Sequence, residues 1–341
     1  MAAHRGFLET SRITRPFALG VALGGGAARG LAHIGVLKVL CREGLAPQVI
    51  AGTSAGALVG AAFATCGDMV SVEDRFVAYC SGDRFKKSSF GMFRQGDPAR
   101  KTFFQQVTQA VKKGLILGVS ATKPSFISAK SFDEDLRELL PDPPIEDLPL
   151  PFCAIATDIV AGKEVVMRTG SLRVAVAASC ALPGVLPPVA WRGTTLIDGG
   201  SVNKVPAGPA RSMGADLVVA VDIHASLPES PVLTRGLDIV SRSNAITGHK
   251  LRELLLAEAD VVIRPEVGHI HWADFGRYAE AIRSGEEAAS RAPPRAARAG
   301  PGRAPQAIPG TLATAPDRSW TRARAEPALA DRRRGARRSK S

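Results

Sequence analysis

The sequence lacks the segments that would place it across a membrane. No run of 18 or more apolar residues occurs in its 341 residues, which excludes a transmembrane helix. The first 16 residues have no apolar core, so they do not resemble a secretory signal peptide. The sequence therefore predicts a cytoplasmic protein that meets membranes only at their surface.

Cysteine pairs with metal-binding or redox spacing are also missing. None of the five cysteines forms a C-x-x-C pair, which is typical of free thiols in a reducing compartment. They are Cys41, Cys66, Cys80, Cys153 and Cys180. His269 and His271 have no carboxylate cluster beside them, and no dense acidic loop suits calcium. We therefore expect neither a metal site nor a bound cofactor.

The phosphate-binding motifs of nucleotide enzymes are absent too. No G-x-x-x-x-G-K-[ST] loop occurs anywhere in the chain. The turn that begins at Gly24 matches a dinucleotide fingerprint, G-x-G-x-x-G, only in part. Arg29 occupies the third glycine position, and Gly30 follows one residue late. Nucleotide binding is therefore not expected of this turn.

Acidic residues are scarce at one end of the chain. The formal net charge is +12, and residues 291–341 supply most of it, with 13 Lys and Arg against 3 Asp and Glu. This end is rich in Ala, Pro, Arg and Gly and cannot bury enough apolar surface to offset its chain entropy, so we expect a disordered tail. Two interpretations stay open for it. It is either an extension without function, or an electrostatic attachment to an anionic membrane or nucleic acid through residues 332–338. A specific nucleic-acid partner is not expected.

What the chain does contain is an alternation of strand-like and helix-like segments. The early strands are continuously apolar, as is typical of a parallel sheet covered on both faces. We predict an extension at residues 1–16 and a three-layer α/β/α domain with a mostly parallel sheet at residues 17–290. Strands are expected at residues 17–23, 49–52, 152–157, 164–168, 194–197, 216–222 and 260–264. Helices are expected at residues 30–43, 55–66, 72–80, 101–114, 131–140, 171–179, 207–213 and 237–256.

Residues 84–128 are the least regular part of this domain. Basic residues are interleaved there with aromatics such as Phe90 and Phe93, and an apolar run follows at residues 115–117. This pattern suits a lid or a membrane interface over a lipid-binding crevice. It equally suits a surface insert whose aromatic side chains belong to the core.

Two glycine-rich turns frame one serine. Residues 52–56 read G-x-S-x-G after an apolar run, a spacing that places Ser54 on a sharp turn from strand to helix. The earlier turn contains Gly24, Gly25 and Gly26 and offers backbone N–H groups at a helix N-terminus, where an oxyanion can be held. Because Ser54, the glycine turn and Asp198 all follow strands, we expect them at the carboxyl edge of the sheet. Together the turns indicate acyl transfer, most simply ester hydrolysis.

A serine hydroxyl needs a base, and no histidine stands in a motif typical of one. His33 falls in a helix-like stretch, where a structural role is expected, and His224 ends a strand-like run, which is a better position for a base. Asp198 follows a short strand and precedes Gly199 and Gly200. Its carboxylate either points into an open crevice or forms the turn, and the spacing leaves both interpretations open.

Three motifs follow one another in a specific order: G-G-G-A-A-R-G from Gly24, G-T-S-A-G from Gly52, and D-G-G from Asp198. In this order they resemble the patatin-like phospholipase family, and in particular its small, single-domain bacterial branch. Further stretches match that branch at residues 30–37, 178–184 and 202–206. The resemblance covers roughly residues 17–290.

The resemblance implies roles for individual residues. The family's catalytic dyad, which contains no histidine, falls on Ser54 and Asp198. The oxyanion hole falls on Gly24, Gly25 and Gly26. The supporting motif positions are Arg29, Gly30, Gly52, Gly56, Gly199 and Gly200. The loop at Ser179 and Pro183 lines the substrate crevice if the resemblance holds there, and is otherwise a buried helix end before a proline-rich loop.

The function that the resemblance implies is hydrolysis of carboxylic esters in phospholipids or related lipids, without a cofactor. An aspartate with an ordinary pKa is a poor base, and desolvation in an apolar crevice would raise that pKa and improve it. Two alternatives come from other classes: a scaffold or regulatory protein with incidental hydrolysis, and a binder of nucleic acid or anionic membrane that acts through the tail. The intact Ser54 and Asp198 argue against the scaffold.

Overall fold

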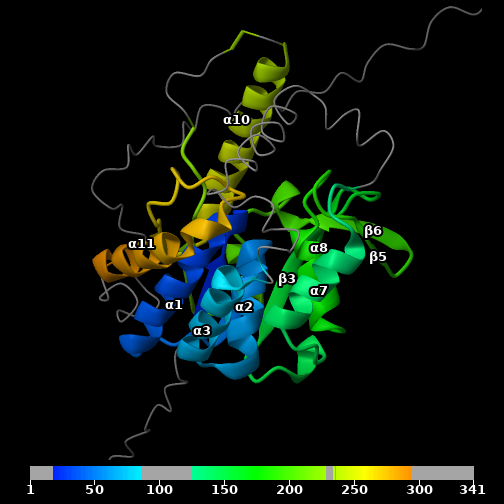
Figure 1. Cartoon of the computed structure of the whole chain (residues 1–341). Helices are drawn as coiled ribbons and strands as arrows, with labels where there is room; N and C mark the ends of the chain where they lie inside the picture. The colour runs from blue at the N-terminus through cyan, green and yellow to red at the C-terminus, as the bar shows by residue number, and fades with distance from the viewer. Residues whose placement is uncertain (1–17, 84, 86–124, 228–232, 235, 293–341) are drawn as a thin grey trace, which may run out of the picture. The chain divides into compact units, whose positions relative to one another are not determined.

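The computed structural model describes residues 18–83, 85, 125–227, 233–234 and 236–292 (Figure 1). The helix expected at residues 101–114, most of the insert at residues 84–128, and the N-terminal extension and tail lie outside the described residues. Among the helices of the described part, none has both the length and the hydropathy that crossing a membrane requires.

One mixed sheet of eight strands organises the described residues. Its strands are β1 (Leu19–Leu23), β2 (Val49–Thr53), β3 (Phe152–Asp158), β4 (Lys163–Met167), β5 (Val189–Trp191), β6 (Thr194–Asp198), β7 (Leu217–Val221) and β8 (Val261–Ile263). They lie in the order β5-β6-β3-β2-β1-β7-β8, with β4 also paired to β3. Strands β3, β2, β1, β7 and β8 run parallel to one another. Strands β4, β5 and β6 add antiparallel pairs next to β3.

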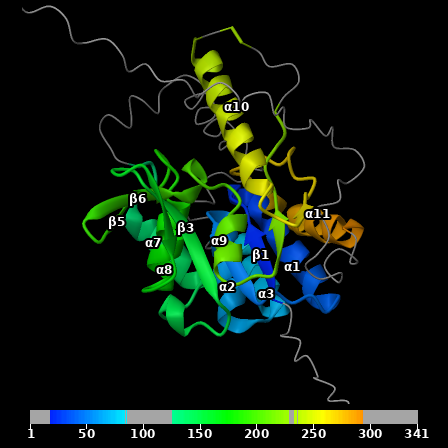
Figure 2. The ribbon, with the colours of Figure 1, turned by 180° about the vertical axis from the view of Figure 1, so that it is seen from behind.

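Helices cover both faces of this sheet, which confirms the expected α/β class. The α-helices are α1 (Ala32–Arg42), α2 (Ala55–Cys66), α3 (Met69–Ser81), α7 (Ala129–Leu139), α8 (Leu172–Cys180), α9 (Ala207–Ser212), α10 (Gly236–Leu256) and α11 (Tyr278–Arg291). Short 3₁₀ turns are η1 (Ala27–Leu31), η3 (Ile145–Asp147), η4 (Gly199–Ser201) and η5 (Phe275–Arg277). Figure 1 shows α1, α2, α3, α7 and α8 on one face, and Figure 2 shows α9 on the other.

The two faces of the sheet pack differently because side chains alternate along each strand. Leu19, Val21 and Leu23 of β1 join the large core beneath the helices of the first face. Ala22 of the same strand faces the smaller core around α9. At Gly20 a β-carbon would lie 2.5 Å from the Ala215 β-carbon, so this face has little space for larger side chains.

Two elements were not expected from the sequence. One is the short strand β5, which pairs with β6 in a hairpin. The other is α11, which packs along α1. These two helices approach closely at a pair of glycines, because a β-carbon on Gly35 would meet the Ile282 carbonyl oxygen and one on Gly285 would meet the Ala32 carbonyl oxygen.

Candidate active site

Ser54 lies where β2 ends and α2 begins, as the motif predicts. Its backbone has φ 53° and ψ −122°, in the region that favours glycine. Ala27, at the start of η1, also has a positive φ of 50°. Both turns that were predicted to build the site therefore hold a non-glycine residue in a strained conformation, which surrounding contacts must maintain.

Glycines allow the serine turn to fit against the sheet. A β-carbon on Gly52 would lie 2.5 Å from Ala57 Cα, and one on Gly56 would meet the Leu23 carbonyl oxygen. A β-carbon on Gly30 would meet that of Ala55, so the helix after the glycine turn packs directly against α2. These motif positions require glycine because backbone approaches backbone there.

A second serine supports Ser54 from a distant part of the chain. The fully buried Ser179, on α8, accepts a hydrogen bond through Oγ from the Ser54 N–H, at 2.8 Å. Without this acceptor the Ser54 N–H would lose its hydrogen bond, and the strained turn would lose a restraint. Ser179 lies in the motif stretch at residues 178–184, but the sequence does not indicate its hydrogen bond with Ser54.

Asp198 reaches the same edge by a route that differs from the expected one. The prediction placed Asp198 at the carboxyl edge because it follows a strand. That reason is wrong, because β6 runs antiparallel to β3 and so opposite to the parallel strands. Thr53, the last residue of β2, pairs with Ile155 of β3, and Asp198 pairs with the next residue, Ala156. Strand β4 pairs along one side of β3, and β2 and β6 both pair along the other side, one after the other. The end of β6 therefore meets the end of β2.

The Asp198 carboxyl group is buried, with 6% of the residue exposed. Burial raises its pKa above the ordinary value, and hydrogen bonds from the Ser54 hydroxyl and the Gly200 N–H, with the charge of Lys204, act in the opposite direction. The Gly200 N–H donates to Oδ1 at 2.7 Å. Thr157 Oγ1 holds the Asp198 carbonyl at 2.9 Å. Asp198 is therefore both a turn former and a buried partner of Ser54.

The glycine turn passes beside Ser54, but its N–H groups are not equivalent. Gly24 N–H donates to the Val221 carbonyl at 3.1 Å, and Gly25 N–H donates to the Lys204 carbonyl at 3.0 Å. Within the described residues, Gly26 is the first glycine of the turn whose N–H donates to no carbonyl. A β-carbon on Gly25 would lie 3.3 Å from that of Ser54, so this turn lies against the serine.

Arg29 points away from the turn that contains it. Its Nε donates to the Ile270 carbonyl at 2.7 Å. Burial lowers its pKa from the ordinary value. Ala28 N–H, next to it, donates to the Trp272 carbonyl at 2.8 Å. Arg29 therefore ties the glycine turn to the segment before α11.

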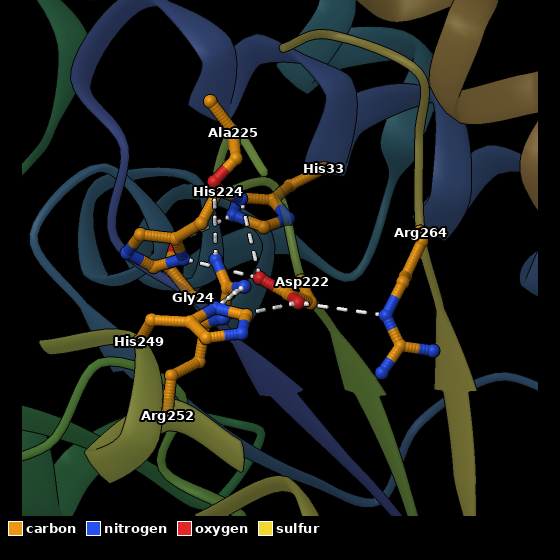
Figure 3. A network of polar contacts seen from close by, with 8 residues as sticks. All are labelled: Gly24, His33, Asp222, His224, Ala225, His249, Arg252 and Arg264. Atoms are coloured by element: carbon orange, nitrogen blue, oxygen red, sulfur yellow. Dashed lines mark hydrogen bonds and ion pairs between the residues drawn. The ribbon is translucent and has the colours of Figure 1, made fainter. Parts of the chain in front are cut away.

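The histidines weighed as a base or as a metal ligand have other partners. His33 Nε2 contacts the Gly24 carbonyl oxygen at 2.7 Å, and His224 Nδ1 contacts Asp222 Oδ1 at 3.1 Å (Figure 3). His269 pairs with Glu280 at 2.6 Å. Among the described residues, no group of three or more His, Cys, Asp or Glu side chains is arranged to hold a metal ion.

An apolar pocket adjoins Ser54. Its cavity volume is about 80 Å³, and it opens to solvent. Aliphatic and aromatic side chains from η1, α2, α3, α7, the loop after α8 and the segment before α11 line it, among them Leu58, Phe76, Phe132, Leu186 and Phe275. Cys180 also lines it, and burial raises the pKa of its thiol. All five cysteines are free thiols, as expected.

The fold and the site define an α/β protein with a serine at a strand-to-helix elbow, a buried aspartate beside it and a glycine-rich turn next to both. The model of the family described as patatin-like phospholipase matches residues 21–211. The chain belongs to this family, which confirms the resemblance read from its motifs.

Relatives of several kinds share this domain. Patatin-like phospholipase domain-containing protein 7 of Rattus norvegicus is 36% identical over 222 residues, which are 64% of this chain and 14% of the relative. Patatin-like phospholipase domain-containing protein 6 of Homo sapiens is 34% identical over 298 residues, 85% of this chain and 19% of the relative. An uncharacterized NTE family protein of Mycobacterium bovis is 34% identical over 206 residues, 60% of this chain and 49% of the relative. The chain thus spans about a seventh of the rat relative's length.

Proposed function

We propose that this protein is a serine acyl hydrolase that cleaves carboxylic esters of phospholipids or related lipids. The observation that carries the proposal is the buried Asp198, whose pKa the neighbouring Ser54 hydroxyl lowers, beside an apolar pocket that Ser54 lines. Membership of the patatin-like phospholipase family supports the same chemistry.

In the proposed reaction Asp198 accepts the proton of the Ser54 hydroxyl as Oγ attacks the ester carbonyl carbon. The carbonyl oxygen becomes an oxyanion, and we assign the Gly26 N–H as a donor to it, because the Gly24 and Gly25 N–H groups bind carbonyls. The first N–H groups of α2 have no acceptor within the helix, so they are available to assist. Asp198 then gives its proton to the leaving alcohol, and an ester bond joins the acyl group to Ser54.

Water completes the cycle by the same steps. Asp198 takes a proton from a water molecule, which attacks the acyl-enzyme, and Ser54 regains its proton as the fatty acid leaves. The raised pKa makes Asp198 a stronger base than an exposed aspartate. Lys204 favours the ionised form and thereby keeps a fraction of Asp198 ready to accept the proton.

The pocket indicates the substrate class. Its walls near Ser54 are almost wholly apolar, so an acyl chain would be removed from water there. We therefore propose a lipid ester as substrate, met at the surface of a membrane. The basic segment proposed for contact with an anionic membrane, residues 332–338, lies outside the described residues.

The test is hydrolysis of a medium-chain p-nitrophenyl ester by the purified chain and by Ser54→Ala and Asp198→Ala. We expect both variants to lose at least about 10³-fold in kcat while circular dichroism stays unchanged. Matched controls are Ser241→Ala and Asp147→Asn, which alter an exposed serine and an exposed aspartate. An inactive wild type, or a Ser54→Ala variant as active as wild type, would favour the scaffold interpretation instead.

A further inference from the structure

His33 is a polar side chain in a fully buried position. It lies in the first turn of α1, directly after the glycine turn, and none of its surface is exposed. Burial lowers its pKa to about 4, so the imidazole is neutral at physiological pH. A buried imidazole of this kind is costly to desolvate, and an apolar side chain would fill the space without that cost.

The tautomer of His33 follows from its single acceptor. The Gly24 carbonyl oxygen can only accept a hydrogen bond, so the ring nitrogen 2.7 Å from it, Nε2, carries the proton. Nδ1 is buried and has no hydrogen-bond partner among the described residues. The ring is therefore oriented by one bond, and that bond is made to the glycine turn.

Nearby charged groups do not supply another partner. Asp222 is the neighbouring carboxylate, and it already accepts hydrogen bonds from the N–H and the ring of His224 (Figure 3). Its second oxygen lies 3.6 Å from Nε of both Arg252 and Arg264. His33 is thus separate from this cluster in its hydrogen bonding, although the charges of His224 and Asp222 influence its pKa.

The bond from His33 fixes one particular peptide unit. The Gly24 carbonyl and the Gly25 N–H belong to the same peptide group, the first accepting from His33 and the second donating to the Lys204 carbonyl. A peptide between two glycines rotates easily, because neither residue has a β-carbon that restricts φ and ψ. Held at both ends, this peptide sets the direction in which the chain continues to Gly26.

We propose that His33 is a positioning residue that keeps the Gly24–Gly25 peptide from rotating and so aims the Gly26 N–H at the reacting carbonyl. Rotation would turn the Gly24 carbonyl oxygen toward the serine and place a negative dipole where the oxyanion forms. The inference rests on the proposed ester hydrolysis for its effect on rate. Its structural part, the restraint of the peptide, is independent of that function.

The kinetic test compares His33→Leu, which removes the donor, with His33→Gln, whose amide nitrogen can replace Nε2. We expect His33→Leu to lower kcat about 10²-fold with KM within twofold, and His33→Gln to recover at least tenfold. Val39→Ala, buried on the same helix, is the control for lost packing and is expected to keep wild-type kcat. Wild-type kcat in His33→Leu, or no recovery in His33→Gln, would overturn the proposal.

Amide hydrogen exchange separates this inference from the proposed function. In His33→Leu the Gly25 N–H is expected to exchange at least tenfold faster than in wild type, and in His33→Gln at a rate near wild type. Unchanged Gly25 exchange in His33→Leu would overturn the inference even if the enzyme is active. A restored Gly25 rate in a chain that hydrolyses no ester would uphold the restraint and reject the function. If His33→Leu does not fold, His33→Asn takes its place, because its shorter amide does not reach Gly24.

Discussion

At the scale of single residues, the site depends on groups held in unfavourable states. Ser54 has a backbone conformation that L-residues rarely adopt, and Asp198 has a carboxyl group removed from water. Each is held by contacts from elsewhere in the chain, Ser54 by Ser179 and Asp198 by Thr157 and Gly200. Such arrangements are typical of sites in which stability is reduced for the sake of reactivity.

The raised pKa of Asp198 leads to a prediction about stability. The pKa of Asp198 is higher in the folded protein than in the unfolded chain, so the unfolded chain ionises first as the pH rises. The free energy of unfolding therefore falls as the pH rises through the folded pKa. The neutral Asp198→Asn variant should therefore be more stable than wild type at pH 7, by about 1 kcal/mol, while its esterase activity falls to background. Urea unfolding at pH 7 measures the first effect.

The exposed control Asp147→Asn should change the free energy of unfolding by less than about 0.5 kcal/mol. At pH 3, where both the folded and the unfolded carboxyl groups are largely protonated, the advantage of Asp198→Asn should shrink. A variant that is less stable than wild type at pH 7 would show that burial of the Asp198 charge is fully compensated.

At the scale of elements, strand direction and helix contact decide where the site residues meet. Strand β6 brings Asp198 to Ser54 because it runs against β3 and ends where β2 ends. Helix α11 packs along α1, the helix that follows the glycine turn and carries His33. The glycine turn is thus enclosed between elements that are far apart in the chain.

The contact between α1 and α11 leads to a second prediction. A β-carbon on Gly285 would meet the Ala32 carbonyl oxygen and would lie 3.1 Å from the Val36 nitrogen, and neither backbone atom can move without displacing a helix. We expect Gly285→Ala to lower the free energy of unfolding by about 2 kcal/mol, as measured in urea.

Gly236→Ala is the matched control, because nothing lies within 4 Å of a β-carbon there and the residue begins helix α10. It is expected to be neutral or slightly stabilising. Equal stabilities for the two variants would mean that α11 adjusts its position against α1 without cost.

At the scale of the whole molecule, buried histidines make the fold sensitive to acid. Burial lowers the pKa of His33, His224 and His271, so the unfolded chain binds protons that the folded chain refuses. The contribution of these histidines to the free energy of unfolding is therefore largest above the unfolded pKa of about 6.5, and it is lost as the pH falls toward the folded values.

His33 supplies a measurable part of this dependence. With a folded pKa of about 4, it should reduce the free energy of unfolding by about 2 kcal/mol between pH 7 and pH 5. The His33→Gln variant has no titrating ring at this position, so its stability should fall by correspondingly less over the same range. Urea unfolding at both pH values tests this, and equal slopes for the two proteins would contradict it.

The sequence by itself determined the local part of this protein. The prediction placed Ser54 correctly between a strand and helix α2. It could do so because turn geometry and helix formation depend on residues within about four positions of one another. Family membership followed from the order of the motifs. The amphipathic helix α11 was missed, and so was the three-residue strand β5.

Only the tertiary structure decided which groups bind one another. The antiparallel course of β6, the hydrogen bond from the Ser54 N–H to Ser179 Oγ, 125 positions away, and the hydrogen bonds of the Gly24 and Gly25 N–H groups all depend on distant partners. The same is true of His33, whose position in a helix was predicted but whose restraint of Gly24 was not. Hydrogen bonds in a buried core are satisfied by whichever groups the packing brings near, and packing is a property of the whole chain.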